Sequence, residues 1–214
     1  TDGRLLVRAD DDRVTTYDVT GAHPEQLETI ELPGMEGAEI LLAGDTVVAV
    51  GRDDAQPTSD TYAVPQQDTR LVVLDVSDPG APVVTDTFVT NTDLQATRQT
   101  GDTVRLVLSS RLPDLDFVEP GRWRSDDRAL EQNRDRIRES SIEDWLPTVT
   151  SYDAEGEGTV RPLVDCDRVA LPSTEAGLGT MVVAGFDAAE PTDWDVSAVA
   201  TDSDVVYMST DRLY

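Results

Sequence analysis

Short apolar runs, separated by turn residues, recur along the first half of the chain. Residues 47–50 and 71–74 are apolar without a break, which is typical of strands that are covered on both faces. Residues 25–32 instead mix apolar and polar side chains in the alternating manner of a strand with one face in water. The runs are rich in β-branched residues, and Gly, Asp and Pro stand between them. The pattern predicts antiparallel sheets whose central strands are buried.

The same pattern appears twice at a constant offset of 57 residues. RVTTYDVTGAHPEQLETIEL begins at Arg13, and RLVVLDVSDPGAPVVTDTFV begins at Arg70. The offset holds further along the chain, because the GDTV at Gly44 returns at Gly101. Self-similarity at this period indicates arrays or propellers, in which each unit packs on the next.

Four short antiparallel strands per unit describe a propeller blade. We predict an all-β fold: a β-propeller fragment of about three four-stranded blades with a helical insertion, forming a single partial domain over residues 1–214. The blade strands fall in residues 4–32, 38–89, 94–110 together with 179–200, and 204–214. Closed propellers have roughly four to eight blades, so we expect either further blades outside this sequence or association of two chains through open strand edges.

The strand pattern lapses between Ser110 and Gly179, and a helix is predicted within about residues 122–146. Apolar residues recur there at helical spacing among many charges, and Ser140 with Glu143 resembles a capping box for a second short helix. The insertion is either a lid or partner-binding arm, or a helix lying across a blade edge. The candidate partner-binding residues are Trp123, Leu130, Ile137 and Trp145.

Charge narrows the classes of partner. The chain has 43 acidic and 17 basic residues, all of the latter arginine, and a formal net charge of −26. Such a surface repels nucleic acid and anionic lipid, so neither is expected as a partner. No apolar run reaches the ~20 residues of a membrane-spanning helix. Two explanations of this charge balance stay open: a GC-rich genome, which replaces lysine codons with arginine codons, or a salt-rich habitat, in which acidic surfaces hold water.

The single histidine and the single cysteine are weak candidates for catalysis or metal binding. His23, the only histidine, lies in a turn and has no counterpart in the second repeat, so we expect an exposed substituent and not a catalytic base. Cys166, the only cysteine, is either a small buried hydrophobe or half of a disulfide whose partner lies outside this sequence. Its acidic neighbours Asp165 and Asp167 oppose a reactive thiolate. We assign no catalytic, cofactor-binding or metal-ligating residue.

Acidic loops are the remaining candidates. They lie at residues 10–12, 53–54, 114–116 and 202–204. Ca²⁺ is the ion such loops could hold, although none matches the spaced ligands of a calcium loop, and a carboxylate pair could serve glycoside hydrolysis. Asp18 and Asp75 recur at equivalent strand ends, so we expect them to cap turns through local hydrogen bonds.

Several stretches together resemble a group of secreted bacterial and archaeal proteins with a C-terminal β-propeller domain distantly related to WD repeats. They are TRLVVLDVSDPGAPVVTDTF from Thr69, DTVRLVLSS from Asp102, WLP at Trp145, LVDCDRV from Leu163 and DSDVVYMSTDRLY from Asp202. The resemblance implies an extracellular or cell-surface protein with a signal sequence upstream, and it supplies no catalytic residues. We therefore expect a non-enzymatic extracellular scaffold that binds a protein or a small ligand. The alternative is a secreted hydrolase with carboxylate chemistry on the axial face of the propeller.

Overall fold

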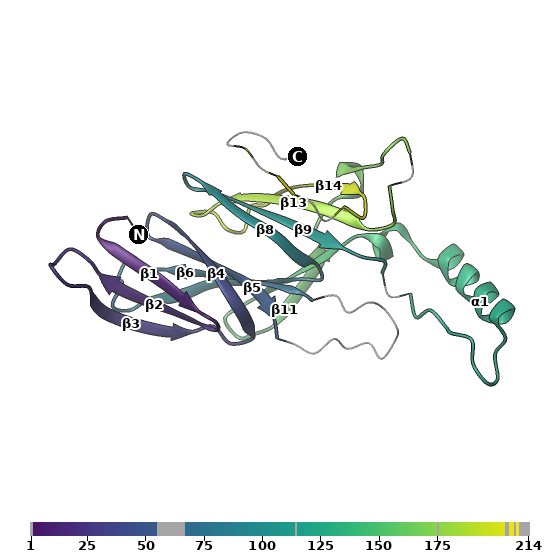
Figure 1. Cartoon of the computed structure of the whole chain (residues 1–214), viewed down its shortest axis with the longest axis horizontal. Helices are drawn as coiled ribbons and strands as arrows, with labels where there is room; N and C mark the ends of the chain where they lie inside the picture. Colours follow the sequence, from purple (N-terminus) through teal and green to yellow (C-terminus); the bar gives the residue numbers. More distant parts are fainter. Residues whose placement is uncertain are drawn as a thin grey trace.

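The computed structural model describes residues 2–54, 67–113, 115–174, 176–203, 206–207 and 209. These residues form three sheets, side by side, and one α-helix that extends beyond them (Figure 1). All strand pairs are antiparallel except one two-residue pairing between β12 and β14. The predicted all-β propeller fragment with a helical insertion is confirmed.

The first sheet has the order β1 (Leu5–Asp10), β2 (Arg13–Asp18) and β3 (Glu25–Glu31). The two-residue turn between β1 and β2 places Asp11 at φ +55°, the left-handed conformation that tight hairpin turns require.

The second sheet contains a complete four-stranded unit. Its strands are β4 (Met35–Ala43), β5 (Thr46–Asp53), β6 (Thr69–Asp75) and β7 (Val83–Thr90). The insertion adds β10 (Thr148–Tyr152) and β11 (Gly158–Pro162) to the outer edge, beside β7. The sheet therefore has six strands in all.

The third sheet is interrupted in sequence but continuous in space. Its strands are β8 (Asp93–Thr100), β9 (Thr103–Ser110), β13 (Thr180–Asp187), β14 (Asp195–Ala200) and, at the outer edge, β12 (Val169–Ala170). Between β9 and β13 lie α1 (Asp126–Glu139) and the 3₁₀ turns η1 (Ile142–Trp145) and η2 (Cys166–Arg168).

The expectation that strands are absent between Ser110 and Gly179 is wrong, because β10, β11 and β12 lie there. These strands have five residues or fewer. β10 is stabilised by pairing with β7, β11 by pairing with β10, and β12 by pairing with β14. Such non-local pairing leaves only a weak local pattern. Of the blade strand expected in 204–214, most residues lie outside the described chain, and residues 206, 207 and 209 lie in no strand.

Two apolar layers hold the sheets together. On β5, Val47 and Ala49 pack between the first and second sheets, whereas Val48 and Val50 pack between the second and third. All four side chains are fully buried. This explains the unbroken apolar run: alternate side chains of a strand point to opposite faces, and here both faces are covered.

The first strand of the first sheet, β1, corresponds to β5, the second strand of the complete four-stranded unit. β1 packs against β4, the innermost strand of the next sheet, just as β5 packs against β8. The strand ends also match, because Asp18 accepts a hydrogen bond from the Thr20 backbone N–H at 2.7 Å and Asp75 accepts one from Ser77 at 2.8 Å. The capping role predicted for these aspartates is confirmed. Within the described residues, the first sheet has no counterpart of β4 or β8.

Candidate functional site

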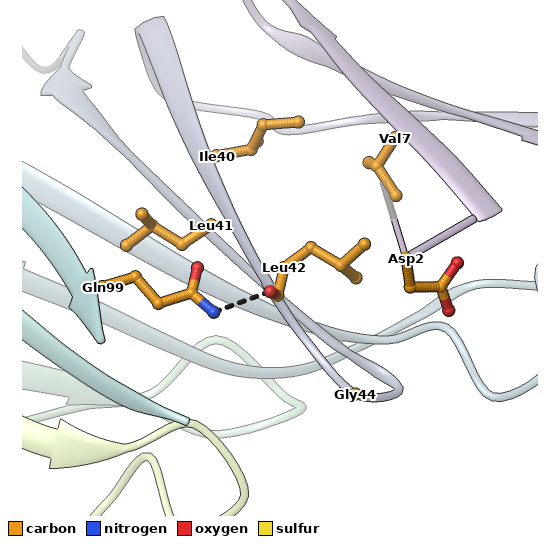
Figure 2. Close-up of a pocket in the computed structure, with 7 residues that line it drawn as sticks. All are labelled: Asp2, Val7, Ile40, Leu41, Leu42, Gly44 and Gln99. Atoms are coloured by element: carbon orange, nitrogen blue, oxygen red, sulfur yellow. Dashed lines mark hydrogen bonds between the residues drawn. The ribbon is translucent and has the colours of Figure 1, made fainter. Parts of the chain in front are cut away.

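A pocket of about 300 Å³ opens beside the innermost strands of the sheets. Its lining residues are Asp2, Val7, Ile40, Leu41, Leu42, Gly44 and Gln99 (Figure 2). β1 supplies Val7, β4 supplies the three large aliphatic residues, and β8 supplies Gln99. Four of the seven lining residues are aliphatic, but polar atoms make up the larger part of the surface that faces the pocket, so its lining differs from the mostly apolar wall of a usual ligand pocket.

Polar side chains of β8 hold the third sheet against β4 at this pocket. Gln99 donates from Nε2 to the carbonyl oxygen of Leu42 at 2.7 Å (Figure 2) and to that of Gly101 at 2.9 Å. Thr97 donates from its hydroxyl to Oε2 of Glu39 at 2.8 Å. An outward-facing carbonyl of β4 is therefore satisfied by a side chain from the neighbouring sheet.

Three carboxylates gather at the opposite ends of the strands. Asp53 ends β5, Asp68 precedes β6 and Asp93 begins β8. Burial, and then the charges of Asp53 and Asp93, raise the pKa of Asp68 to about 6. Asp53 is held by Arg70, whose Nε lies 2.7 Å from Oδ1. A carboxyl group whose pKa is raised by burial and by neighbouring carboxylates is a feature that general-acid catalysis uses.

The arm, which we define as residues 111–147, carries the predicted partner-binding residues. Ser125 caps α1 by accepting from the Arg128 backbone N–H, and Asn133 exchanges hydrogen bonds with the backbone of Val118 at 2.8 and 2.9 Å. Arg136 donates to the Leu115 carbonyl at 3.1 Å. The polar face of the helix thus packs on the arm itself, and Figure 1 shows α1 projecting away from the sheets.

The four predicted partner-binding residues differ in exposure. Trp123, Leu130 and Ile137 are exposed, and the last two lie seven residues apart on α1 and so share one face. Trp145 is half-buried and donates from Nε1 to the Ser140 hydroxyl at 2.9 Å. Trp145 therefore helps to fix the turn after α1.

The predicted capping box is displaced by one residue. The Asp144 carboxylate accepts from the Ser141 backbone N–H at 2.7 Å, whereas the sequence suggested Ser140 and Glu143. The Ser140 hydroxyl instead donates to the Ile137 carbonyl at the end of α1. Two adjacent serines each offered a cap, and the length of α1 decides which one is used.

The other candidates lie apart from the pocket. His23 is exposed in the connection between β2 and β3, as predicted. Of the two interpretations of Cys166, the buried hydrophobe is wrong: Cys166 is exposed and free in η2, and the preceding Leu163 and Val164 supply the buried side chains there. Its disulfide with a partner outside the sequence stays a prediction.

The acidic loops show no assembled cation site in the described part of the chain. No group of three or more His, Cys, Asp or Glu side chains there could hold a metal ion. Asp11 instead accepts from the Gly37 backbone N–H, and Asp202 accepts from Leu178 and Gly179. Asp114 and Asp204 lie outside the described residues.

One aromatic cluster was not predicted from the sequence. Trp194 lies between Phe88 of the second sheet and Phe186 of the third, with ring centroids 5.3 and 5.6 Å away. Its size was the available signal, because large aromatic side chains usually contribute to cores and interfaces. No helix of the described chain is long and apolar enough to cross a membrane.

Comparison with known proteins gives one finding. Neither the curated proteins nor the solved structures include a significant match to this chain. A family model described as a beta propeller domain matches residues 1–214. Together with the three sheets joined by buried apolar layers, this match shows that the chain belongs to the beta propeller domain family.

Proposed function

We propose that the chain is a non-enzymatic, extracellular β-propeller scaffold that binds a protein or ligand through its arm. The observation that carries the proposal is Trp123, whose side chain is 87% exposed. An indole left in water is costly, and here the Arg122 guanidinium lies 5.4 Å from its ring. Exposed tryptophan and arginine side chains are the types that dominate binding energy in protein interfaces.

Charge supports the same surface. Residues 122–138 contain six arginines and four acidic residues, a net charge of +2, in a chain whose net charge is −26. Residues 122–138 are thus a locally cationic stretch within the arm, and they carry the exposed apolar residues Leu130 and Ile137. Opposite charge at an interface raises the association rate and orients the partner.

The arm can be tested by matched substitutions. A triple variant, Trp123→Ala, Leu130→Ala and Ile137→Ala, is compared with a control variant, Val160→Ala, Leu171→Ala and Leu178→Ala, which removes equally exposed residues elsewhere. Both are applied with the parent chain to arrays of purified surface proteins and glycans. The proposal predicts that the arm variant loses binding about a hundredfold or more while the control retains it. Equal binding by all three proteins contradicts the proposal.

The extracellular location is part of the proposal and rests on the resemblance described above. It predicts that the protein in its native cells is digested by protease added to intact cells. Survival of the protein until the cells are lysed contradicts it.

The carboxylate cluster favours a second candidate, a secreted hydrolase. Burial and the neighbouring Asp53 and Asp93 raise the pKa of Asp68, as expected of a general acid. Turnover of a panel of glycosides and esters that Asp68→Asn abolishes, while Asp54→Asn leaves it unchanged, would support this function. Absence of turnover by the parent chain rejects it.

A further inference from the structure

Residues 67–69 and residues 90–93 form a junction between the second and third sheets. The first segment leads into β6 of the second sheet, and the second segment runs from the end of β7 to the first residue of β8. The Gln67 backbone N–H donates to Oδ1 of Asp93 at 2.9 Å. This hydrogen bond joins the two sheets at the junction.

Buried hydroxyl groups reinforce the junction. Thr69 donates from its hydroxyl to the Thr92 carbonyl at 2.6 Å, and the hydroxyls of Thr90 and Thr92 share a hydrogen bond of 2.6 Å. All three residues are buried. Because buried polar groups are costly when they are unpaired, the junction is stable only while its two segments remain in contact.

Asp68 lies within the junction, directly opposite a second carboxylate. The Asp53 N–H donates to the Asp68 carbonyl at 2.8 Å, which continues the antiparallel ladder of β5 and β6 by one pair. Side chains of directly opposed residues are neighbours on one face of a sheet, and like charges there are destabilising. The charge of Asp93 opposes the ionisation of Asp68 as well.

The guanidinium group of Arg70 is engaged by Asp53. Its Nε and Nη2 each lie 2.7 Å from Oδ1 of Asp53, and both side chains are largely buried. Cζ of Arg70 lies 5.9 Å from the centroid of the Tyr152 ring, and the backbone at Gly34 packs so closely that an added Cβ would lie 2.9 Å from Cζ. The guanidinium group is therefore fixed by its surroundings beside Asp53.

Asp68 has no such partner. Within the described residues, its carboxyl group makes no hydrogen bond and no ion pair. A second guanidinium group, that of Arg111, lies with its Nε 3.7 Å from Oδ2 of Asp93. Ionisation of Asp68 therefore adds a negative charge without a counter-ion beside two carboxylates that have one.

We propose that this junction is a pH-sensitive switch, which holds the second and third sheets together while Asp68 carries a proton and loosens when Asp68 ionises. Burial, and then the charges of Asp53 and Asp93, raise the pKa of Asp68 to about 6. A group whose pKa is raised in the closed state stabilises that state below its pKa, and the contribution is lost as the pH rises through it. Loosening separates Gln67 from Asp93 and leaves the rest of the fold intact. The switch lies in the sheets and is independent of binding by the arm.

Residue-specific hydrogen exchange on the full chain tests the switch. With rates corrected for the intrinsic pH dependence of exchange, the Gln67 amide should lose protection about tenfold between pH 4.5 and pH 7.5. The Leu106 amide lies in β9, which is paired on both sides within the third sheet. It should keep its protection, which separates local opening from global unfolding.

Two variants identify the group that titrates. Asp68→Asn is neutral at every pH, so at pH 7.5 its Gln67 amide should be as protected as that of the parent at pH 4.5. Asp54→Asn removes a charge from an exposed neighbouring position and should leave the pH response of the Gln67 amide unchanged.

Four results overturn the proposal. They are a Gln67 amide whose protection does not change with pH, a loss of protection that the Leu106 amide shares, and a full pH response that persists in Asp68→Asn. The fourth is a Gln67 amide that loses protection towards acid, because protonation of the acceptor Asp93 would then control the contact.

Discussion

Asp68 shows how the acidic composition acts on a single residue. Burial favours its neutral form, and the negative charges of Asp53 and Asp93 favour it further, so its pKa rises to about 6. The folded chain then binds this proton more tightly than the unfolded chain, in which an aspartate has a pKa near 3.8. The stabilising contribution is therefore complete below about pH 4 and is lost as the pH rises through 6.

We predict that Asp68→Asn stabilises the fold above pH 6. The variant keeps the shape of the side chain and removes the charge, which should raise the free energy of unfolding at pH 7.5 by about 1 kcal/mol after allowance for solvent screening. Urea unfolding at pH 4.5 and pH 7.5 measures the gain, which should shrink at the lower pH. Asp54→Asn, an exposed position nearby, controls for the general benefit of removing a negative charge. Equal gains for both variants contradict the prediction.

At the scale of elements, the hairpin β10–β11 offers a matched pair of substitutions. Val149 is fully buried between sheets, whereas Val160 on the paired strand is 64% exposed. We expect Val149→Ala to lower the free energy of unfolding by about 1–2 kcal/mol, from lost apolar contact and a residual cavity. Val160→Ala should change it by less than about 0.5 kcal/mol. Chemical denaturation measures both, and equal effects would mean that the hairpin does not form part of the core.

This hairpin could not be predicted from the sequence, whereas other strands could. The strands β5 and β6 were predictable because their apolar runs repeat at a fixed offset and need both faces covered. β10 and β11 were not, because β10 is specified mainly by pairing with β7, far away in sequence, and β11 in turn pairs with β10. The shared face of Leu130 and Ile137 on α1 was predictable from their spacing. The half-buried state of Trp145 was not, because it depends on a hydrogen bond to Ser140 that no periodic pattern in the sequence indicates.

At the scale of the whole molecule, the pocket depends on how three sheets are placed. Val7, Leu42 and Gln99 come from different sheets, and their distance depends on the stacking angle between blades. Repetition in the sequence indicates that units stack, but the angle results from packing in the two apolar layers. The number of units was therefore predictable, and the lining of the pocket was not.

Net charge is the other property of the whole molecule, and it predicts a dependence on salt. With 43 acidic residues against 17 arginines, folding brings many like charges together, and their repulsion opposes the compact state. Salt screens this repulsion, so the free energy of unfolding in urea should rise between about 0.05 and 1 M NaCl. A variant with Glu25→Gln and Glu155→Gln, both exposed, should show a smaller rise because it carries less charge. A free energy of unfolding that falls as NaCl increases would contradict this prediction. It would mean that attractive ion pairs such as Arg70–Asp53 contribute more to stability than the long-range repulsion between the acidic residues takes away.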